Sequence, residues 1–364
     1  MSTLATRLAG KRVLICAGAG GVGKTTVSAA IALGLAAQGR RVAVVTIDPA
    51  RRLAEALGVD QLGNEPRRVD PALLTRTGLE VHGELDAMML DAKRTFDELI
   101  ARLAPDASTR DRILANPIYQ HLSTAVAGSQ EYTAIAKLFD LTREADYEAI
   151  VLDTPPSRSA VDFLDAPERL IGFIEGRALA TFLRPTGRAL RAAGLMFVAL
   201  RRITGVGLLE DLTTFFGLLS GLLEGFRARA ADVQALLTDR ATAFVIVTSP
   251  ERTAVDEAIR FADELKRNGM HRSGVIVNRI HPLDHNGADA ASVASRLAPA
   301  LGGRLAETVA QVHEDVQLLA RTDQAAVQRL RAALRWPTPV CLTDRDRDLH
   351  DLPGLADLHR ELFG

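Results

Sequence analysis

The segment GAGGVGKT occupies residues 18–25 and is followed by a second threonine, Thr26. Glycines at this spacing let main-chain N–H groups turn inward around phosphate oxygens. Lys24 adds a point charge for the β- and γ-phosphates, and the Thr25 hydroxyl can ligate Mg²⁺. A helix that starts near Lys24 adds the positive end of its dipole. The segment predicts a site for a nucleoside triphosphate with Mg²⁺; the alternative is a glycine loop without a ligand.

Apolar runs on both sides of this segment indicate how the chain folds. Each short run is followed by a helical pattern and ends at a polar residue, which is typical of buried parallel strands with functional residues at their carboxyl ends. We therefore expect an α/β fold with a doubly wound, mostly parallel sheet. The expected strands are 12–16, 42–47, 149–152, 244–247 and 275–277, and the expected first helix is 25–38.

Two long insertions, at about 91–146 and 165–239, lack strand alternation and are expected to form a helical subdomain within a single domain of residues 1–364. The second carries apolar residues at helical spacing, with polar residues on the other side. Such a stripe fits a helix that packs on its neighbours. The alternative is a groove for a hydrophobic client, for which the candidate residues are Leu208, Leu212, Phe215, Phe216 and Leu219.

Composition excludes several classes of protein. A hydrophobic content of 47% with 24% charged residues argues against disorder, and a net charge of −1 gives no global attraction to nucleic acid. The cysteines, Cys16 and Cys341, rule out a disulfide framework and a four-thiolate zinc site within one chain. No apolar run reaches the roughly 20 residues of a membrane span. We expect a cytoplasmic protein that associates with membranes at most transiently.

Two acids follow apolar strands and are candidates for the chemistry of this site. Asp153 ends the strand 149–152, where an acid can hold Mg²⁺ through water, and Asp48 follows the strand 42–47. Each also fits a helix N-cap, with Pro49 at the first helical position after Asp48. The residues alone leave both readings open.

Five motifs together resemble the arsenite-pump and tail-anchored-protein-targeting ATPases, a family with the P-loop NTPase type of fold. They are GGVGKTT at 20–26, DPA at 48–50, DTPPS at 153–157, Pro250-Glu251 and Val277-Asn278-Arg279. The resemblance covers the core of the chain, from about residue 12 to 355. In the helical insertions it is limited to placement and character.

This resemblance implies a dimer that opens and closes with ATP hydrolysis and uses its helical insertions as a composite surface. By position, ATP and Mg²⁺ would be held by Gly20, Gly21, Val22, Gly23, Lys24, Thr25 and Thr26. Asp48 and Lys24 would act in catalysis, Asp48 by orienting the attacking water, and Asp153 would join Thr25 at the metal. Glu251 resembles the residue that reaches nucleotide near the interface, and Asn278 resembles the amide that reads adenine.

Three departures from the family pattern affect these expectations. The family loop usually carries a second lysine that crosses to the partner's nucleotide, and Ala19 stands there. Arg51-Arg52 follows the DPA motif, and Arg158-Ser159 replaces the usual Gly-His. These arginines could replace the lost charge, a paralogue could supply the lysine in a heterodimer, or the arginines could be ordinary solvated side chains.

The resemblance leaves the partner open. The chain could be an ATP-driven dimeric switch for a hydrophobic client or a membrane-associated partner, or a low-turnover ATP-gated scaffold paired with a paralogue. Two cysteines make a poor arsenite site, and without a Cys-x-x-Cys pair no zinc clasp is expected. DNA-partitioning and cell-division relatives need a basic surface or a terminal membrane helix, so no nucleic-acid partner is expected.

Overall fold

A computed structural model describes residues 4–48, 51–76, 78–120, 129–154, 171–172, 207–284, 288–335, 338–345 and 351–364. Within these ranges, the side chains of 129–133 and 207–213 are not described.

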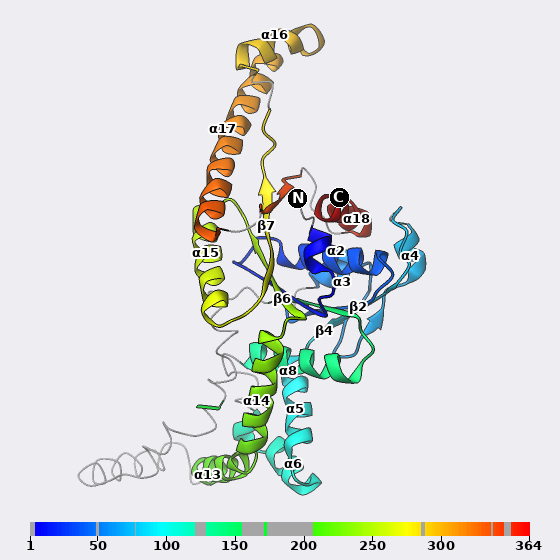
Figure 1. Cartoon of the computed structure of the whole chain (residues 1–364), viewed down its shortest axis with the longest axis vertical. Coiled ribbons are helices and arrows are strands. Elements are labelled where there is room, and N and C mark those ends of the chain that lie inside the picture. The colour runs from blue at the N-terminus through cyan, green and yellow to red at the C-terminus, as the bar shows by residue number, and fades with distance from the viewer. Residues whose placement is uncertain are drawn as a thin grey trace, which may run out of the picture.

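An eight-stranded sheet forms the centre of the molecule, in the order β3-β4-β2-β5-β1-β6-β7-β8 (Figure 1). Every neighbouring pair is parallel except β3 and β4. The predicted α/β fold with a mostly parallel sheet is confirmed. The strands are β1 (Val13–Ala17), β2 (Arg41–Thr46), β3 (Arg67–Arg68), β4 (Glu84–Met89), β5 (Ala149–Asp153), β6 (Thr242–Thr248), β7 (Arg272–Ile280) and β8 (Val340–Thr343).

Helices cover both faces of the sheet because alternate side chains of each strand point to opposite faces. In β1, Leu14 and Cys16 join the core cluster beneath one face, whereas Val13 and Ile15 join the cluster beneath the other. The first face is covered by α1 (Leu4–Leu8), α2 (Lys24–Ala37), α3 (Arg52–Ala56) and α18 (Leu352–Phe363); the second by α8 (Ser129–Glu144), α14 (Leu223–Thr238), α15 (Arg252–Arg267) and α17 (Gly303–Leu334). A short helix, α4 (Pro71–Thr75), lies before β4.

The described parts of the two insertions are helical and share a third apolar cluster. They contain α5 (Ala92–Leu103), α6 (Ala107–Leu114), α8, α13 (Gly207–Ser220) and α14, which lie together at one end of the molecule (Figure 1). The cluster includes Phe96, Tyr119, Phe215, Leu219 and Phe226.

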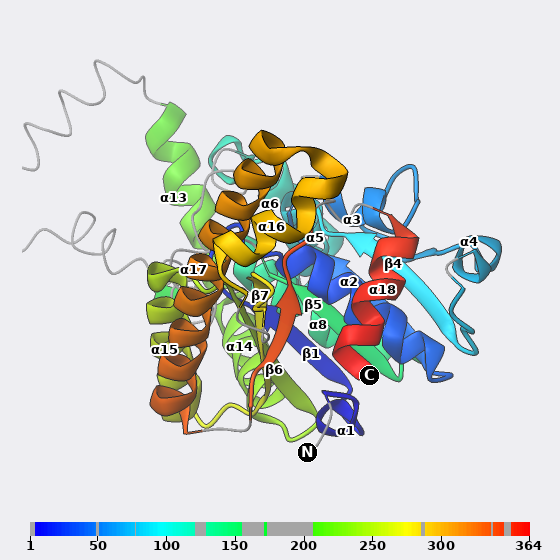
Figure 2. The same cartoon turned by 90° about the horizontal axis from the view of Figure 1, so that it is seen from above.

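A helical arm extends from the opposite end of the long axis (Figure 1). It consists of α16 (Ala290–Leu301) and α17, which are joined at Gly302 and pack on each other. The view from above shows the arm standing over the sheet region (Figure 2). No helix in the described ranges is both long enough and apolar enough to span a membrane.

Candidate functional site

The phosphate-loop segment connects β1 to α2 and runs between the neighbouring strand β6 and the end of β7. A Cβ atom on Gly18 would lie 1.9 Å from the Val247 carbonyl oxygen, so only glycine fits there. Gly21 and Gly23 have φ angles of 78° and 90°, which glycine adopts without strain. Gly23 is the N-cap of α2, so the loop ends at the amino terminus of a fourteen-residue helix.

Lys24 is the first residue of α2 and is 6% exposed. Its Nζ donates a hydrogen bond to the Ala19 carbonyl oxygen at 2.8 Å, so the side chain folds back over its own loop. Burial lowers the pKa of this ammonium group, and the negative charges of Asp153, Glu257 and Asp48 oppose that change. The result is a positive charge inside the loop with acids nearby.

Asp153 connects the phosphate loop to two strands. Its Oδ2 accepts hydrogen bonds from the Thr25 hydroxyl at 2.7 Å and from the Thr46 hydroxyl at 2.9 Å. The side chain is 1% exposed, and burial raises the pKa of this carboxyl to about 6 despite the two hydroxyl donors and Lys24. Its other oxygen, Oδ1, is buried without a hydrogen-bond partner in the described residues.

These groups fit a magnesium ion bound with a nucleotide. Mg²⁺ prefers oxygen ligands and keeps several waters, with one hydroxyl and a water-linked carboxylate from the protein and the rest from phosphate. Thr25 supplies the hydroxyl, and the unpartnered Oδ1 of Asp153 can accept a hydrogen bond from such a water. In the described residues no three His, Cys, Asp or Glu side chains gather into a metal cluster, which this type of magnesium site does not require.

The other predicted residues lie at different distances from this centre. Asp48 is half-buried just after β2, and its main-chain N–H donates to the Thr46 hydroxyl at 3.2 Å. Asn278 lies in β7, and its Nδ2 donates to the Val22 carbonyl oxygen at 3.0 Å. Glu251 is the exposed N-cap of α15. Pro49, Ala50 and the segment from Pro155 to Ser159, including Arg158, lie outside the described residues.

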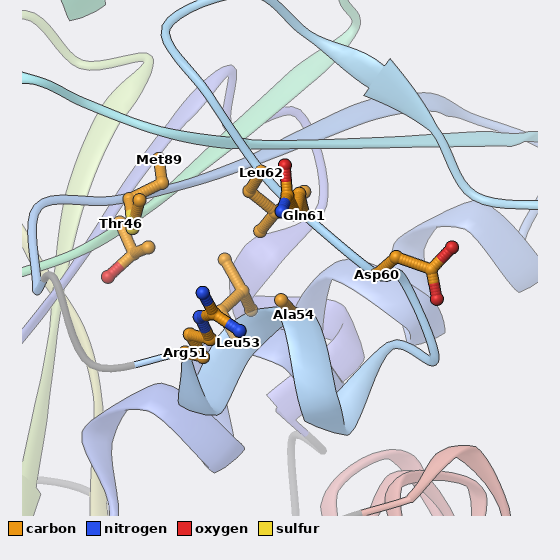
Figure 3. Close-up of a pocket in the computed structure, with 8 residues that line it drawn as sticks. All are labelled: Thr46, Arg51, Leu53, Ala54, Asp60, Gln61, Leu62 and Met89. Atoms are coloured by element: carbon orange, nitrogen blue, oxygen red, sulfur yellow. The ribbon is translucent and has the colours of Figure 1, made fainter.

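Arg51 borders a cavity of about 230 Å³ beside the carboxyl end of β2 (Figure 3). Figure 3 shows its guanidinium and the Gln61 side chain on different sides of this space. The lining residues are Thr46, Arg51, Leu53, Ala54, Asp60, Gln61, Leu62 and Met89. Because Thr46 also bonds Asp153, the cavity borders the candidate magnesium site. Arg52 is exposed at the start of α3.

The structure adds residues that the sequence reasoning did not assign to the site. Thr46 is the third member of the Asp153 cluster, and its position at the carboxyl end of β2 next to Asp48 was the available signal. The Thr154 hydroxyl donates to the Cys16 carbonyl oxygen at 2.9 Å and fixes the backbone after Asp153. Cys16 itself is buried, which raises the pKa of its thiol to about 12.

The candidate client residues lie on α13, in the third cluster rather than near the loop. Phe215 and Leu219 are each 2% exposed and pack inside that cluster, and Phe216 is half-buried against it. The side chains of Leu208 and Leu212 lie outside the described part of the structure. In this conformation, α13 therefore uses at least two of the five side chains for internal packing.

Comparisons with known proteins agree with this geometry. A sequence profile described as "Anion-transporting ATPase" matches residues 11–315. ATPase GET3 of Malassezia globosa is 29% identical over 268 residues, which cover 73% of this chain and 72% of that protein. ATPase ARSA1 of Chlamydomonas reinhardtii is 29% identical over 294 residues, and the match covers 74% of this chain and 35% of that protein. Putative arsenical pump-driving ATPase 1 of Aquifex aeolicus is 25% identical over 287 residues, and the match covers 74% of this chain and 64% of that protein.

Proposed function

The chain belongs to the anion-transporting ATPase family, and from this premise we propose that it binds ATP with Mg²⁺ at residues 18–26 and hydrolyses it. The arrangement that carries the proposal is the hydrogen bond from Thr25 to Asp153 beside the buried Lys24. A helix amino terminus, a cation, a hydroxyl and a carboxylate meet there, as phosphoryl transfer requires.

Each side chain has a distinct role in the proposed reaction. Lys24 leaves the Ala19 carbonyl and binds the β- and γ-phosphate oxygens, where it offsets charge that develops during transfer. Thr25 and Asp153 would hold the magnesium ion, which would supply positive charge to offset that of the phosphates. Asp48 orients the attacking water. Positioning and electrostatics supply the rate, because this reaction needs little covalent help from protein.

We further propose that the ATPase works as a dimeric switch in the cytoplasm, coupling its nucleotide state to a hydrophobic client or a membrane-associated partner. The relatives' names mention ATPase and arsenical-pump functions. Arsenite is a poor candidate here, because Cys16 and Cys341 lie on β1 and β8, three strand spacings or roughly 14 Å apart. The helical end with α13 supports the client proposal, since it is distinct from the nucleotide site.

A second candidate is a low-turnover, ATP-gated half of a heterodimer. The observation that favours it is Ala19, which provides no cation where the resembling family places its second lysine. Loss of a cation that acts across an interface can lower turnover by several orders of magnitude. Under this alternative the chain binds ATP tightly and hydrolyses it only with a paralogue.

Nucleotide titration and steady-state hydrolysis of Lys24→Ala test the proposal, with the solution mass recorded alongside. We expect nucleotide affinity to fall by at least about a hundredfold, because a buried charge–phosphate contact is lost. Lys266→Ala, an exposed lysine in the last turn of α15, serves as the control and should leave affinity unchanged. Equal affinity of Lys24→Ala and the wild type would refute the site. Tight binding without turnover in the wild type would select the heterodimer alternative.

A further inference from the structure

The cavity beside the carboxyl end of β2 has a buried floor and an exposed mouth. Thr46 and Leu53 line it and are each 1% exposed. Arg51 and Gln61 also line it, and both are exposed. Because the Thr46 hydroxyl donates to Asp153, Thr46 separates this space from the candidate magnesium site. We call the space lined by these residues the side cavity.

The mouth of the side cavity has N–H donors that no protein group uses. In the described part of the chain, neither the Arg51 guanidinium nor the Gln61 side-chain amide has a hydrogen-bond or ion-pair partner. Figure 3 shows the Asp60 carboxylate pointing away from Arg51. Arg67 lies beside Gln61, because its Nη1 donates to the Gln61 main-chain oxygen at 3.0 Å. The mouth therefore has two guanidinium groups against one carboxylate.

Hydrogen bonds hold the wall that carries Gln61. The Met89 main-chain N–H donates to the Gly63 carbonyl oxygen at 3.0 Å, which fixes this wall to β4. Asn64 is 3% exposed, and its Nδ2 donates to Glu98 of α5 at 3.0 Å. Gln61 thus belongs to a segment that is fixed to two elements of the fold. Such support is typical of a preformed ligand site.

The charge and the volume of the side cavity fit a small oxyanion. A guanidinium group presents its N–H donors in a fork that matches the oxygens of a phosphate, and an amide adds a further donor. The cavity volume of about 230 Å³ corresponds to roughly seven or eight water molecules. It lies below the roughly 300–1,000 Å³ of pockets for larger ligands. Inorganic phosphate with a few waters fits this space.

We propose that the side cavity receives the inorganic phosphate that the proposed ATP hydrolysis releases, on its way to solvent; the proposal rests on that function. In hydrolysis the oxygen of water bonds to the γ-phosphorus as the bond from this phosphorus to the ADP oxygen breaks, and a water proton passes to the phosphate or to solvent. The phosphate therefore departs on the side from which water attacked. Asp48, proposed to orient that water, lies in the chain between Thr46 and Arg51, which both line the side cavity.

The remaining walls suit an anion that stays only briefly. Leu53, Ala54, Leu62 and Met89 line the side cavity, and their apolar side chains provide no further donors. Phosphate oxygens that face these walls keep their hydrogen bonds only to water, so the net affinity is low, in roughly the millimolar range. A weak site of this kind binds a product in transit and does not retain it.

Phosphorus NMR of inorganic phosphate titrated into the chain tests the proposal, with the phosphate loop filled by Mg²⁺ and a non-hydrolysable ATP analogue. Because the analogue occupies the γ-phosphate position, phosphate that still binds must lie elsewhere. We expect the wild type to bind phosphate and Arg51→Met to raise the dissociation constant at least about tenfold, because a charge-assisted contact is lost. Ala54→Leu, which fills the cavity without a change of charge, should also weaken binding. Arg52→Met, at the neighbouring arginine that does not line the cavity, is the matched control.

Single-turnover hydrolysis adds a kinetic readout. Acid quenching measures bond cleavage, and a fluorescent phosphate sensor measures release. Arg51→Met should slow release at least about threefold without slowing cleavage, because the anion then passes apolar walls without a compensating charge. Slower cleavage in Arg51→Met would place the guanidinium at the transition state and would overturn the proposal.

Equal phosphate affinity in the wild type and Arg51→Met would refute the site, as would a wild type that binds no phosphate well above millimolar concentration. Gln61→Leu, at an exposed position where folding is not at risk, repeats the test if Ala54→Leu fails to fold. Affinity for the ATP analogue, measured on the same samples, separates the two proposals. A chain that binds no analogue lacks the site in residues 18–26, whereas one that binds the analogue but no phosphate lacks only the phosphate site.

Discussion

Asn278 donates a hydrogen bond from Nδ2 to the main-chain carbonyl oxygen of Val22, 256 residues earlier in the chain, at 3.0 Å. A Cβ atom on Gly23 would lie 2.3 Å from the same Nδ2. The glycine next to Val22 and the asparagine at the end of β7 therefore depend on each other. This contact joins the phosphate loop to the strand from which the arm extends.

Asn278→Asp should weaken nucleotide binding by roughly tenfold or more and lower the free energy of unfolding by about 1–3 kcal/mol. The substituted carboxylate faces the Val22 carbonyl, so two acceptors meet where a donor met an acceptor, and the negative charge repels phosphate. Isothermal titration with ATP and denaturant unfolding measure the two effects.

Asn268→Asp is the matched control for this substitution. The Asn268 Nδ2 also donates to a main-chain carbonyl at 3.0 Å, that of Glu264 at the end of α15. We expect it to cost stability without changing nucleotide affinity. If both variants bind ATP like the wild type, the contact between Asn278 and Val22 has no part in nucleotide binding.

Asp153→Asn should be more stable than the wild type at pH 7.5 in the absence of metal. Burial raises the pKa of Asp153 to about 6 from 3.8, so the folded chain retains a proton that the unfolded chain releases between pH 4 and pH 6. The free energy of unfolding of the wild type therefore falls as pH rises through this window, by about 3 kcal/mol from this group. The variant lacks the ionisable group, so its free energy of unfolding should not show this fall between pH 4 and pH 6.

Denaturant unfolding of the wild type and of Asp153→Asn at pH 4, 5, 6 and 7.5 checks this prediction. The difference between their free energies of unfolding should grow as pH rises. The variant should also lose most Mg²⁺-dependent hydrolysis, because the carboxylate that accepts from Thr25 is gone. A stability difference that does not vary with pH would show that the pKa of Asp153 is ordinary in the folded chain.

Much of this site could be predicted from the sequence because its backbone and its chemistry are local. The order of β1, the phosphate loop, α2 and β2 follows from apolar runs and glycine spacing, and the observed strand Val13–Ala17 differs by one residue from the expected 12–16. Asp153 could be placed at a strand end for the same reason. Its pairing with Thr46 depends on two strands that are distant in sequence being neighbours in the sheet.

Other features could not be predicted because tertiary contacts decide them. Strand β4 contains the buried Asp86, which interrupts the apolar run and is stabilised by Arg68 and by the Tyr147 hydroxyl at 2.7 Å. Strand β8 alternates between buried and more exposed residues at the sheet edge. The exposure of apolar residues on the arm, such as Leu305 and Val312, could not be predicted, because apolar residues at helical spacing look the same on any core-facing helix and their exposure depends on where the body of the protein ends.

Ala19→Lys should raise ATP turnover of the purified chain by at least about tenfold if the missing cation limits hydrolysis. A positive charge near the transferred phosphate offsets charge that develops in the transition state. Ala19→Met controls for side-chain length without charge. Steady-state phosphate release, measured at saturating ATP, reports the result, and equal rates for the lysine and methionine variants would exclude a missing charge as the cause of low turnover.

Arg51→Met complements this comparison. Arg51 lines the cavity beside Thr46. If its guanidinium replaces the lost lysine, the Arg51→Met substitution should lower the ATP turnover of the chain. Arg52→Met, at the neighbouring arginine that does not line the cavity, is the control.

The double variant Leu212→Asp, Phe216→Asp should lose capture of a hydrophobic client while keeping ATP binding. Phe215 is 2% exposed and its ring lies 5.2 Å from that of Phe216, so the cluster is anchored by Phe215 and leaves Phe216 half-covered at its edge. Phe215→Ala should therefore lower the free energy of unfolding by about 3–5 kcal/mol, whether or not clients bind.

Pull-down of a synthetic apolar helix of about 20 residues measures capture by the double variant. Thr214→Asp places the same charge on the exposed side of α13 and is the control. If the double variant loses its helical circular-dichroism signal or its thermal transition along with capture, Leu212 and Phe216 belong to the internal packing and the client surface must lie elsewhere.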